Sequence, residues 1–303
     1  MSLKDYLRIL PEVSDALSAG RPIVALESTV ITHGLPYPDN LEVTNETLAM
    51  VKSRGVVPAV ILIDNGYINV GLSDSEVLEL SYGVSSGKVC NKASIADIGP
   101  LLAGGATGST TVAATMLCAQ LAGIKVFATG GIGGVHRGVV EDFDISNDLQ
   151  ALRDISVAVV ASGAKSILDI PKTLEVLETF GVCIVGYGTD RFPCFYSSSS
   201  SHQLLHHTDD IQDLAKIVRI QLETGHGVLV ANPIPAESEI PRELVEVWVD
   251  MAVSEAAEAG IKGKAVTPFL LKRLLELSDG KSVAANRALL INNAKVAAEI
   301  ACA

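Results

Sequence analysis

Short apolar runs rich in β-branched residues alternate along this chain with stretches whose apolar residues recur every three or four positions. The apolar runs are residues 22–29, 57–64, 125–130, 155–162, 182–188 and 227–235. The stretches of helical period lie between them and end at a glycine, at residues 41–55, 110–123 and 171–181. Strands that alternate with helices of this kind are typical of α/β proteins. The pattern therefore predicts a three-layer α/β/α fold with a mixed, largely parallel central sheet.

The rest of the chain adds a hairpin strand and a helical C-terminal segment to this prediction. Residues 68–72 are expected to form a short extra strand in a small hairpin, and residues 237–303 have the periodicity of helices that wrap the sheet. A serine run at 197–201, followed by histidines, is interpreted as a mobile surface loop rather than a metal site, because its candidate ligands lack strand or helix spacing. Without repeats or long linkers, residues 1–303 are predicted to form a single domain.

Composition narrows the class of protein. Hydrophobic residues make up 48% of the chain and charged residues only 19%, so many elements are expected to be buried on both faces. The formal net charge is −12, from 23 Lys and Arg against 35 Asp and Glu, which argues against broad binding of nucleic acid or anionic membranes. It does not exclude a local basic pocket for one phosphate. Five cysteines without a C-x-x-C pair, and no signal peptide or membrane span, predict a cytoplasmic protein with reduced thiols.

A glycine-rich stretch, ATGGIGGVHRG at residues 128–138, follows one of the predicted strands. It fails the dinucleotide-binding pattern, because His136 stands where the third glycine is required. The loop carries Thr129, His136 and Arg137 to the carboxyl end of a strand, where ligands bind in open α/β sheets. A purely structural turn with a solvated histidine and arginine is an equally good interpretation of this stretch alone.

Two further strand ends carry residues suited to catalysis. Within the run 22–29, Glu27 comes directly after the four apolar residues 23–26, and is either a general acid or base or a charge that complements a helix N-terminus. Lys165 follows the run 155–162 with no acidic neighbour within three residues. Burial disfavours the charged form of an amine, and a neutral amine is a nucleophile toward a masked aldehyde. In isolation, a capping or phosphate-contacting role for this lysine is the better interpretation.

Two polar segments complete the candidate pocket. GSTTVAATM, at 108–116, places hydroxyl groups at the predicted start of a helix, which is a ready anion site. FDISNDL, at 143–149, brings together Asp144, Ser146 and neighbouring amide and carboxylate groups. Such closely spaced oxygens suit a hard divalent cation or the hydroxyl groups of a sugar. Helix capping by Ser146 or Asn147 explains the same segment equally well.

Taken together, these segments resemble one enzyme family over nearly the whole chain. The segments that carry the resemblance are VALESTVITHGLPYP, GSTTVAATM, FATGGIGGVHRG, FDISNDL, GAKSILDIPKTLEVLETFGV, ANPIP and TPFLLKRLLEL. In this order they closely resemble pseudouridine-5′-phosphate glycosidase, the indigoidine synthase A-like family, from about residue 10 to the C-terminus. The resemblance implies reversible cleavage of pseudouridine 5′-phosphate into uracil and ribose 5-phosphate. It also implies a homotrimer.

The family's functional residues match positions of this chain. The resemblance makes Lys165 the nucleophile, which forms a Schiff base with a ring-opened ribose, and Glu27 the proton donor. It makes Asp144 the ligand of a divalent metal, Mn²⁺. It assigns substrate contacts to Lys92, Thr111, Val112, Ser146, Asn147 and Asp148, and our hypothesis is that Lys92 contacts the phosphate. Thr129, His136 and Asn286 are expected to line the same pocket and to contact the substrate. Arg137 is expected to have a structural or intersubunit role.

The chain also departs from the family at identifiable places. Position 147 is Asn where the family usually has Ala, and the segment KASIAD lacks the arginines that often follow its lysine. The catalytic pair is intact, so these departures bear on affinity. Two alternatives stay open at this point: another Schiff-base lyase or aldolase that acts on a sugar phosphate, and a non-catalytic protein that binds one.

Overall fold

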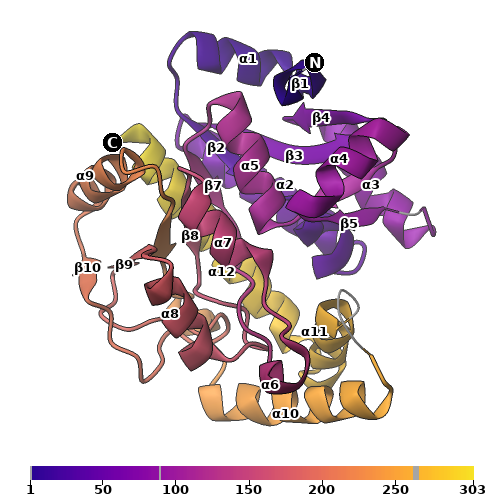
Figure 1. The fold of residues 1–303 in the computed structure, drawn as a ribbon, viewed down its shortest axis with the longest axis vertical. Coiled ribbons are helices and arrows are strands. Elements are labelled where there is room, and N and C mark those ends of the chain that lie inside the picture. The colour runs from indigo at the N-terminus through magenta and orange to yellow at the C-terminus, as the bar shows by residue number, and fades with distance from the viewer. Residues whose placement is uncertain (1, 89, 262–265) are drawn as a thin grey trace.

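The protein is described by a computed structural model that covers residues 2–88, 90–261 and 266–303 (Figure 1). Within these residues the strands form an eleven-stranded sheet whose main path runs β1-β4-β3-β2-β7-β8-β11-β9-β10, with β6 paired to β3 and β5 to β6. The strands are β1 Leu7–Ile9, β2 Ile23–Leu26, β3 Val57–Asp64, β4 Tyr67–Val70, β5 Asn91–Ala93, β6 Gly108–Thr110, β7 Val126–Ala128, β8 Ala158–Ala161, β9 Cys183–Tyr187, β10 His206–Thr208 and β11 Val228–Ala231. Strands β4 and β6 run antiparallel to β3, and the other pairs are parallel.

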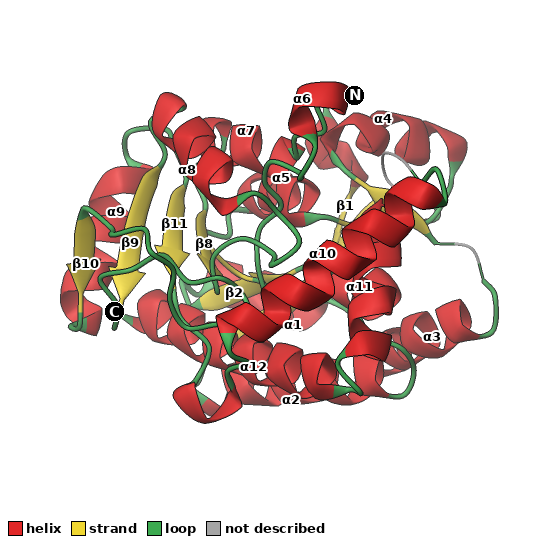
Figure 2. Ribbon diagram, turned by 90° about the horizontal axis from the view of Figure 1, so that it is seen from below, coloured by secondary structure: helices red, strands yellow, loops and turns green. Residues whose placement is uncertain are grey.

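Helices cover both faces of this sheet (Figure 2). The α-helices are α1 Pro11–Ser18, α2 Asp39–Ser53, α3 Asp74–Ser85, α4 Ile95–Gly104, α5 Val112–Ala122, α6 Val139–Asp142, α7 Asn147–Asp154, α8 Ile170–Thr179, α9 Ile211–Leu222, α10 Arg242–Glu258, α11 Val266–Leu277 and α12 Lys281–Cys302. Shorter turns are the 3₁₀ helices η1 Leu3–Tyr6 and η3 Ala236–Ser238 and the π-helix η2 Val30–Gly34.

Side chains of the central strands alternate between two hydrophobic cores. In β2, Ile23 and Ala25 belong to the core formed with α5, α7 and α8, whereas Val24 and Leu26 belong to the core formed with α2, α9 and α12. This two-sided burial is the reason that the strands read as continuous apolar runs. It confirms the predicted α/β fold of three layers with a largely parallel sheet.

Each predicted apolar run contains a strand, and the predicted hairpin is β3 and β4, paired antiparallel with Ile61 opposite Val70. The sequence pattern did not predict β1, β5, β6 and β10. Each of them has three residues, which is too short for the spacing of apolar and polar residues to indicate a strand. The predicted helix at 110–123 begins later, at Val112, because β6 occupies Gly108–Thr110.

The C-terminal segment is mainly helical, as predicted, and its last helix packs against the sheet as part of the core. Its described residues form the end of η3 and helices α10, α11 and α12, joined by short non-helical stretches, and residues 262–265 lie outside the described part of the chain. Helix α12 does not wrap around the outside: it lies against β2, β7 and β8 and packs on α2 and α9, forming much of one helical layer. Small residues such as Ala294, Ala297 and Ala298 are buried along it, which lets the helix approach the sheet closely.

The serine run also differs from its prediction as a mobile surface loop. Ser197 and Ser200 are buried, and the Ser197 hydroxyl donates a hydrogen bond to the carbonyl oxygen of Ile240 at 2.7 Å. The loop is therefore attached to the segment that leads into α10. Among the described residues there is no group of three His, Cys, Asp or Glu side chains that could hold a metal ion. Nor does any helix in the described ranges have the length and apolarity to cross a membrane.

Candidate active site

A cavity of about 640 Å³ opens at the carboxyl ends of β2 and β8 and collects most of the residues predicted from the sequence. Those that line it are Glu27, Lys92, Thr111, Val112, His136, Asp144, Ser146, Asn147, Asp148 and Lys165. The other two, Thr129 and Asn286, line a smaller cavity of about 50 Å³ beside it. Glu27 and Lys165 line both cavities and so lie at the boundary between them. The parallel sheet brings these residues together because β2, β7 and β8 are neighbours that end at one edge.

Glu27 is held rigidly where β2 ends. Its side chain is buried, and the hydroxyl of Thr29 donates to one carboxylate oxygen while the hydroxyl of Thr129 donates to the other. Thr129 follows β7, the strand beside β2, so its contact with Glu27 depends on strand order. The structure thus gives Thr129 a positioning contact with the predicted proton donor.

Lys165 is placed by the glycine loop of the neighbouring strand. Its backbone N–H donates to the carbonyl oxygen of Ile132 at 3.1 Å, and the preceding Ala164 pairs with Ile132 in a parallel bridge beyond the end of β8. The side chain is half-buried. A lysine in this position reaches the boundary between the two cavities while its backbone is fixed by the sheet edge.

The glycine-rich loop contains glycines because its backbone passes close to other groups. At Gly133 an added Cβ would overlap the Ser146 hydroxyl and lie 2.8 Å from Asp148 Oδ2, and at Gly131 it would lie 2.6 Å from the ring of Phe195. The N–H of Gly133 donates to Asp148 Oδ2 at 2.7 Å. The loop therefore uses glycine to bring its own amides against the segment that contains Asp148.

The N-termini of α4, α5 and α7 meet at the larger cavity, which suits an anion. Ser94, Thr111 and Ser146 stand at the N-cap positions of these helices, and all of them line the cavity. Helix N-termini carry unpaired N–H groups and a partial positive charge, and Lys92 lies on the same wall. The Ser146 side chain accepts from the N–H of Asp148 at 3.2 Å, so the capping role considered for Ser146 is present.

Asp148 links two of the elements that form this wall. Its buried carboxylate accepts from the N–H of Ala113, in the first turn of α5, at 2.9 Å, and from the N–H of Gly133 through its other oxygen. Asn147 beside it accepts from the Ser94 hydroxyl at 3.4 Å, joining the starts of α7 and α4. These contacts fix the helix N-termini relative to one another.

Asp144 is half-buried in the larger cavity, close to the helix N-termini. The described residues offer it no group of three protein ligands. Ions such as Mg²⁺ and Mn²⁺ often bind through one or two carboxylates and complete their shell with water and substrate phosphates. The donor set here fits a metal only in that open form, with Asp144 as the protein ligand.

His136 and Arg137 have separate surroundings. His136 lines the larger cavity, and its backbone N–H donates to the carbonyl oxygen of Asp144 at 3.0 Å. Arg137 points to α10, where it donates to Glu246 and to Asp250, each at 2.7 Å. The structural role predicted for Arg137 is therefore present, and its intersubunit alternative stays a prediction.

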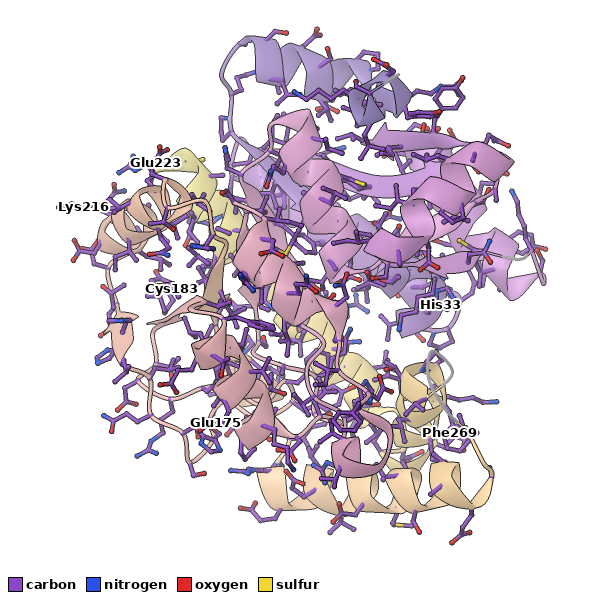
Figure 3. The ribbon with its side chains drawn as sticks, viewed as in Figure 1. His33, Glu175, Cys183, Lys216, Glu223 and Phe269 are labelled. Carbon is purple, nitrogen blue, oxygen red and sulfur yellow. The ribbon has the colours of Figure 1, made fainter. Side chains whose placement is uncertain are left out.

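The smaller cavity contains a histidine that was not among the predicted site residues. His33 lies on η2, a π-helix, and its Nδ1 is 2.6 Å from Thr32 Oγ1 and 3.3 Å from Ser109 Oγ. Burial and the nearby charge of Lys92 lower the pKa of His33 from its ordinary value, so the ring is neutral at neutral pH. In Figure 3 it faces the region of α11, the helix that carries Phe269. The signal in the sequence was only a histidine six positions after Glu27, and a π-turn changes which residues share a face.

Comparison with known proteins bears directly on this site. Residues 12–303 match the family model described as Indigoidine synthase A like protein. The chain belongs to the indigoidine synthase A-like family. A pseudouridine-5′-phosphate glycosidase from Paracoccus denitrificans is 54% identical, with 98% of each chain covered. One from Sorangium cellulosum is 51% identical over all of this chain and 95% of that protein.

Solved structures of this family share the fold. The prealnumycin C-glycosynthase AlnA in complex with ribulose 5-phosphate superposes with a TM-score of 0.88 at 38% identity, over 97% of this chain and 95% of AlnA. An indigoidine synthase A-like protein from Thermotoga maritima gives a TM-score of 0.86 at 36% identity, with the same coverage. At these identities the likeness extends beyond the fold to the family.

Proposed function

We propose that this protein is a pseudouridine-5′-phosphate glycosidase, which reversibly converts pseudouridine 5′-phosphate and water into uracil and ribose 5-phosphate. The observation that carries the proposal is the place of Glu27 and Lys165 on the boundary between two unlike cavities. The larger cavity has helix N-termini, which suit a phosphate, and Lys92 lies where the two cavities meet. The smaller cavity is lined by the amide of Asn286 and the ring of Phe195, which suit a planar base. The names of the relatives support the same substrate.

The bond to be broken joins two carbon atoms, C1′ of the ribose and C5 of the base, so the usual protonation of a leaving oxygen does not apply. The Lys165 amine bonds to C1′ as the bond from C1′ to the ring oxygen breaks, and the ring oxygen takes up, as a hydroxyl, the proton that the lysine nitrogen loses. The C1′–C5 bond then breaks. Its electron pair goes to the base, which gains a proton at C5 from Glu27, while C1′ becomes an iminium with the lysine nitrogen. Water hydrolyses the iminium to release ribose 5-phosphate and the free amine, and the proton set free in this step returns to Glu27.

The two reactive side chains are prepared for these roles by their neighbours. Glu27 cannot swing away, because the hydroxyls of Thr29 and Thr129 hold both of its oxygens. The backbone of Lys165 is held by its hydrogen bond to Ile132, so its side chain extends from a fixed point at the cavity boundary. Fixing both groups relative to the sugar lowers the entropic part of the barrier.

Turnover and trapping test this proposal. Purified protein with Mn²⁺ should release uracil from pseudouridine 5′-phosphate, and Lys165→Ala should abolish release while the far-ultraviolet circular dichroism stays that of the wild type. Borohydride reduction with ribose 5-phosphate should add a pentose phosphate to Lys165. An adduct on another lysine would refute the assigned nucleophile. Binding of ribose 5-phosphate without turnover of this substrate would favour a different enzyme or a non-catalytic protein.

We further propose that Asp144 holds the Mn²⁺ ion, which offsets the negative charge of the bound phosphate. Removal of metal with a chelator should then lower the rate of uracil release, and added Mn²⁺ should restore it. Asp144→Asn should weaken the response to Mn²⁺, seen as a higher Mn²⁺ concentration for half-maximal activity. Equal activity of the chelated and loaded protein would contradict the assignment.

The remaining expectations concern the whole protein. We propose a cytoplasmic homotrimer in which residues 1–303 act as one domain, and small-molecule substrates as its ligands. A mass in solution of about three times the 31.7 kDa chain, measured by light scattering, would support the trimer. A mass of one chain under assay conditions would contradict it.

A further inference from the structure

A second sizeable cavity lies behind the candidate base site. It has a volume of about 350 Å³ and lies among η2, the end of α3, α11 and the start of α12. Its wall includes Tyr37, Ser85, Tyr196 and Leu275. Helix α11 also contacts η2, the element that carries His33.

This second cavity adjoins the candidate active site through shared walls. It shares His33, Gly34, Pro268, Leu271 and Asn286 with the small base-side cavity. That small cavity in turn shares Glu27 and Lys165 with the large cavity that collects the helix N-termini. The three cavities therefore form a row, with the catalytic pair at one junction and His33 at the other.

The two ends of the row differ in chemistry. The second cavity has aromatic, aliphatic and hydroxyl groups, and none of the described residues that line it is a carboxylate. Burial raises the pKa of Tyr196, so its hydroxyl stays neutral, and His33 at the junction is neutral as well. Its lysine, Lys272, is exposed. The large cavity, by contrast, has Lys92, Lys165 and the helix N-termini that attract an anion.

We propose that the second cavity is the passage by which the uncharged base leaves and enters, with His33 and Asn286 at its neck. The inference rests on the proposed function and adds the route by which the base reaches and leaves the site. After the C1′–C5 bond breaks, the sugar remains bonded to Lys165 with its phosphate in the large cavity. A base that left on that side would have to pass the bound sugar phosphate. A volume of 350 Å³ lies within the range of small-molecule sites, about 300–1,000 Å³.

Bulky substitutions that fill the passage test the proposal. Leu275→Trp places a large ring inside the cavity, and Ser85→Trp places one at its exposed rim. Ser86→Trp is the matched control, because Ser86 is the next residue, is also exposed and does not line the cavity. In the synthetic direction uracil and ribose 5-phosphate are separate substrates, so each has its own kcat/KM.

Both passage variants should lower kcat/KM for uracil by about tenfold or more, while Ser86→Trp changes it by less than about twofold. The rate at which ribose 5-phosphate forms its reducible adduct with Lys165 should be that of the wild type in all of them. Melting temperatures within a few degrees of the wild type show that the variants fold, and Ser85→Trp, at an exposed position, serves if Leu275→Trp does not.

Two results would overturn the passage and leave the proposed function standing. One is normal uracil kinetics in both folded variants. The other is an equal loss for uracil and for adduct formation, which would show that the rings disturb the site as a whole. If wild-type protein forms no adduct with ribose 5-phosphate, the proposed function fails, and the passage is refuted with it.

Discussion

At the scale of single residues, the candidate site depends on how Glu27 is held. Its carboxylate is buried at the end of β2, and threonine hydroxyls from two different segments donate to its two oxygens. A buried carboxylate that accepts hydrogen bonds keeps one orientation, because each lost bond leaves a polar atom without a partner. The fold therefore fixes the direction in which the Glu27 carboxyl group points.

We expect Glu27→Gln to lower the rate of uracil release by about 100-fold or more, the scale of a lost general acid. The amide keeps the size of the side chain but cannot give up a proton, and its NH₂ group faces a threonine hydroxyl that donated to the carboxylate. The measurement is kcat, with ribose 5-phosphate adduct formation as a second readout. Thr129→Val should lose less activity than Glu27→Gln. The reverse order would contradict the assignment of the proton donor.

Gly133 makes a second prediction at this scale. Gly133→Ala should destabilise the protein by about 1–3 kcal/mol, because the new methyl group meets Ser146 and Asp148 and part of the wall must move. Chemical denaturation measures the change in the free energy of unfolding. Gly99→Ala is the control: it lies within α4 with no atom in reach of the added Cβ, so it should be neutral or stabilising by up to about 1 kcal/mol. An equal change in the free energy of unfolding in the two variants would contradict the close contact of Gly133 with Ser146 and Asp148.

At the scale of elements, the anion wall depends on the placement of helix starts. Helices α4, α5 and α7 begin at different points of the chain, and each begins at a hydroxyl-bearing N-cap residue. Contacts from Asp148 and Asn147 then tie these starts to one another. Because the dipole effect acts only near the first turn of a helix, the relative position of the three starts decides the strength of the site.

We expect Asp148→Ala to destabilise the protein by about 3 kcal/mol, because it leaves the buried N–H groups of Ala113 and Gly133 without their acceptor. It should also raise KM for the phosphorylated substrate, since the start of α5 is released. Denaturation and steady-state kinetics measure the two effects. Asp154→Ala, at the other end of α7, is the control, because that aspartate is exposed and its ion pair with Arg153, at 3.4 Å, lies at the surface. A similar loss of stability in both variants would contradict the proposed link.

At the scale of the whole molecule, one sheet edge serves as the frame for the site. The neighbours β2, β7 and β8 run parallel, so residues after each of them meet in space although they are far apart in sequence. Helix α12 packs beneath these strands, and Asn286 on it reaches the small cavity. The last helix of the chain is thus both a layer of the core and part of the candidate base site.

The neutral state of His33 predicts a pH dependence of stability. Burial and Lys92 lower its pKa in the folded protein below the ordinary value of 6.5, so near and below that pH the unfolded chain binds more protons. The free energy of unfolding should therefore be largest above pH 6.5 and decrease as the pH falls through the window beneath it. The charged groups that face the ring's cavities are Lys92, Glu27, Lys165 and Lys272.

The measurement compares wild type with His33→Gln by urea denaturation between about pH 5 and pH 8. Gln has no titrating ring, so the contribution of His33 to the slope should vanish in the variant. Carboxylates dominate at lower pH and affect both proteins alike. Parallel curves across the window would contradict the prediction.

The sequence by itself determined the fold class and pointed to the residues that line the two adjoining cavities. Strands that are buried on both faces appear in the sequence as continuous apolar runs, such as residues 57–64. Their alternation with helices indicates a largely parallel sheet. Polar residues directly after such runs, Glu27 among them, must lie at the edge where parallel strands end. These features are local, so a period or a neighbouring residue is enough to reveal them.

Only the tertiary structure decided how distant segments meet. It placed Thr129 on Glu27 and Asp148 between α5 and the glycine loop, and it brought α12 under the sheet. It also turned η2 into a π-helix that carries His33 to the junction of two cavities. Each of these contacts depends on strand order, helix packing or the number of residues in a turn. The local spacing of apolar residues does not predict these contacts, because they follow from the packing of the whole chain.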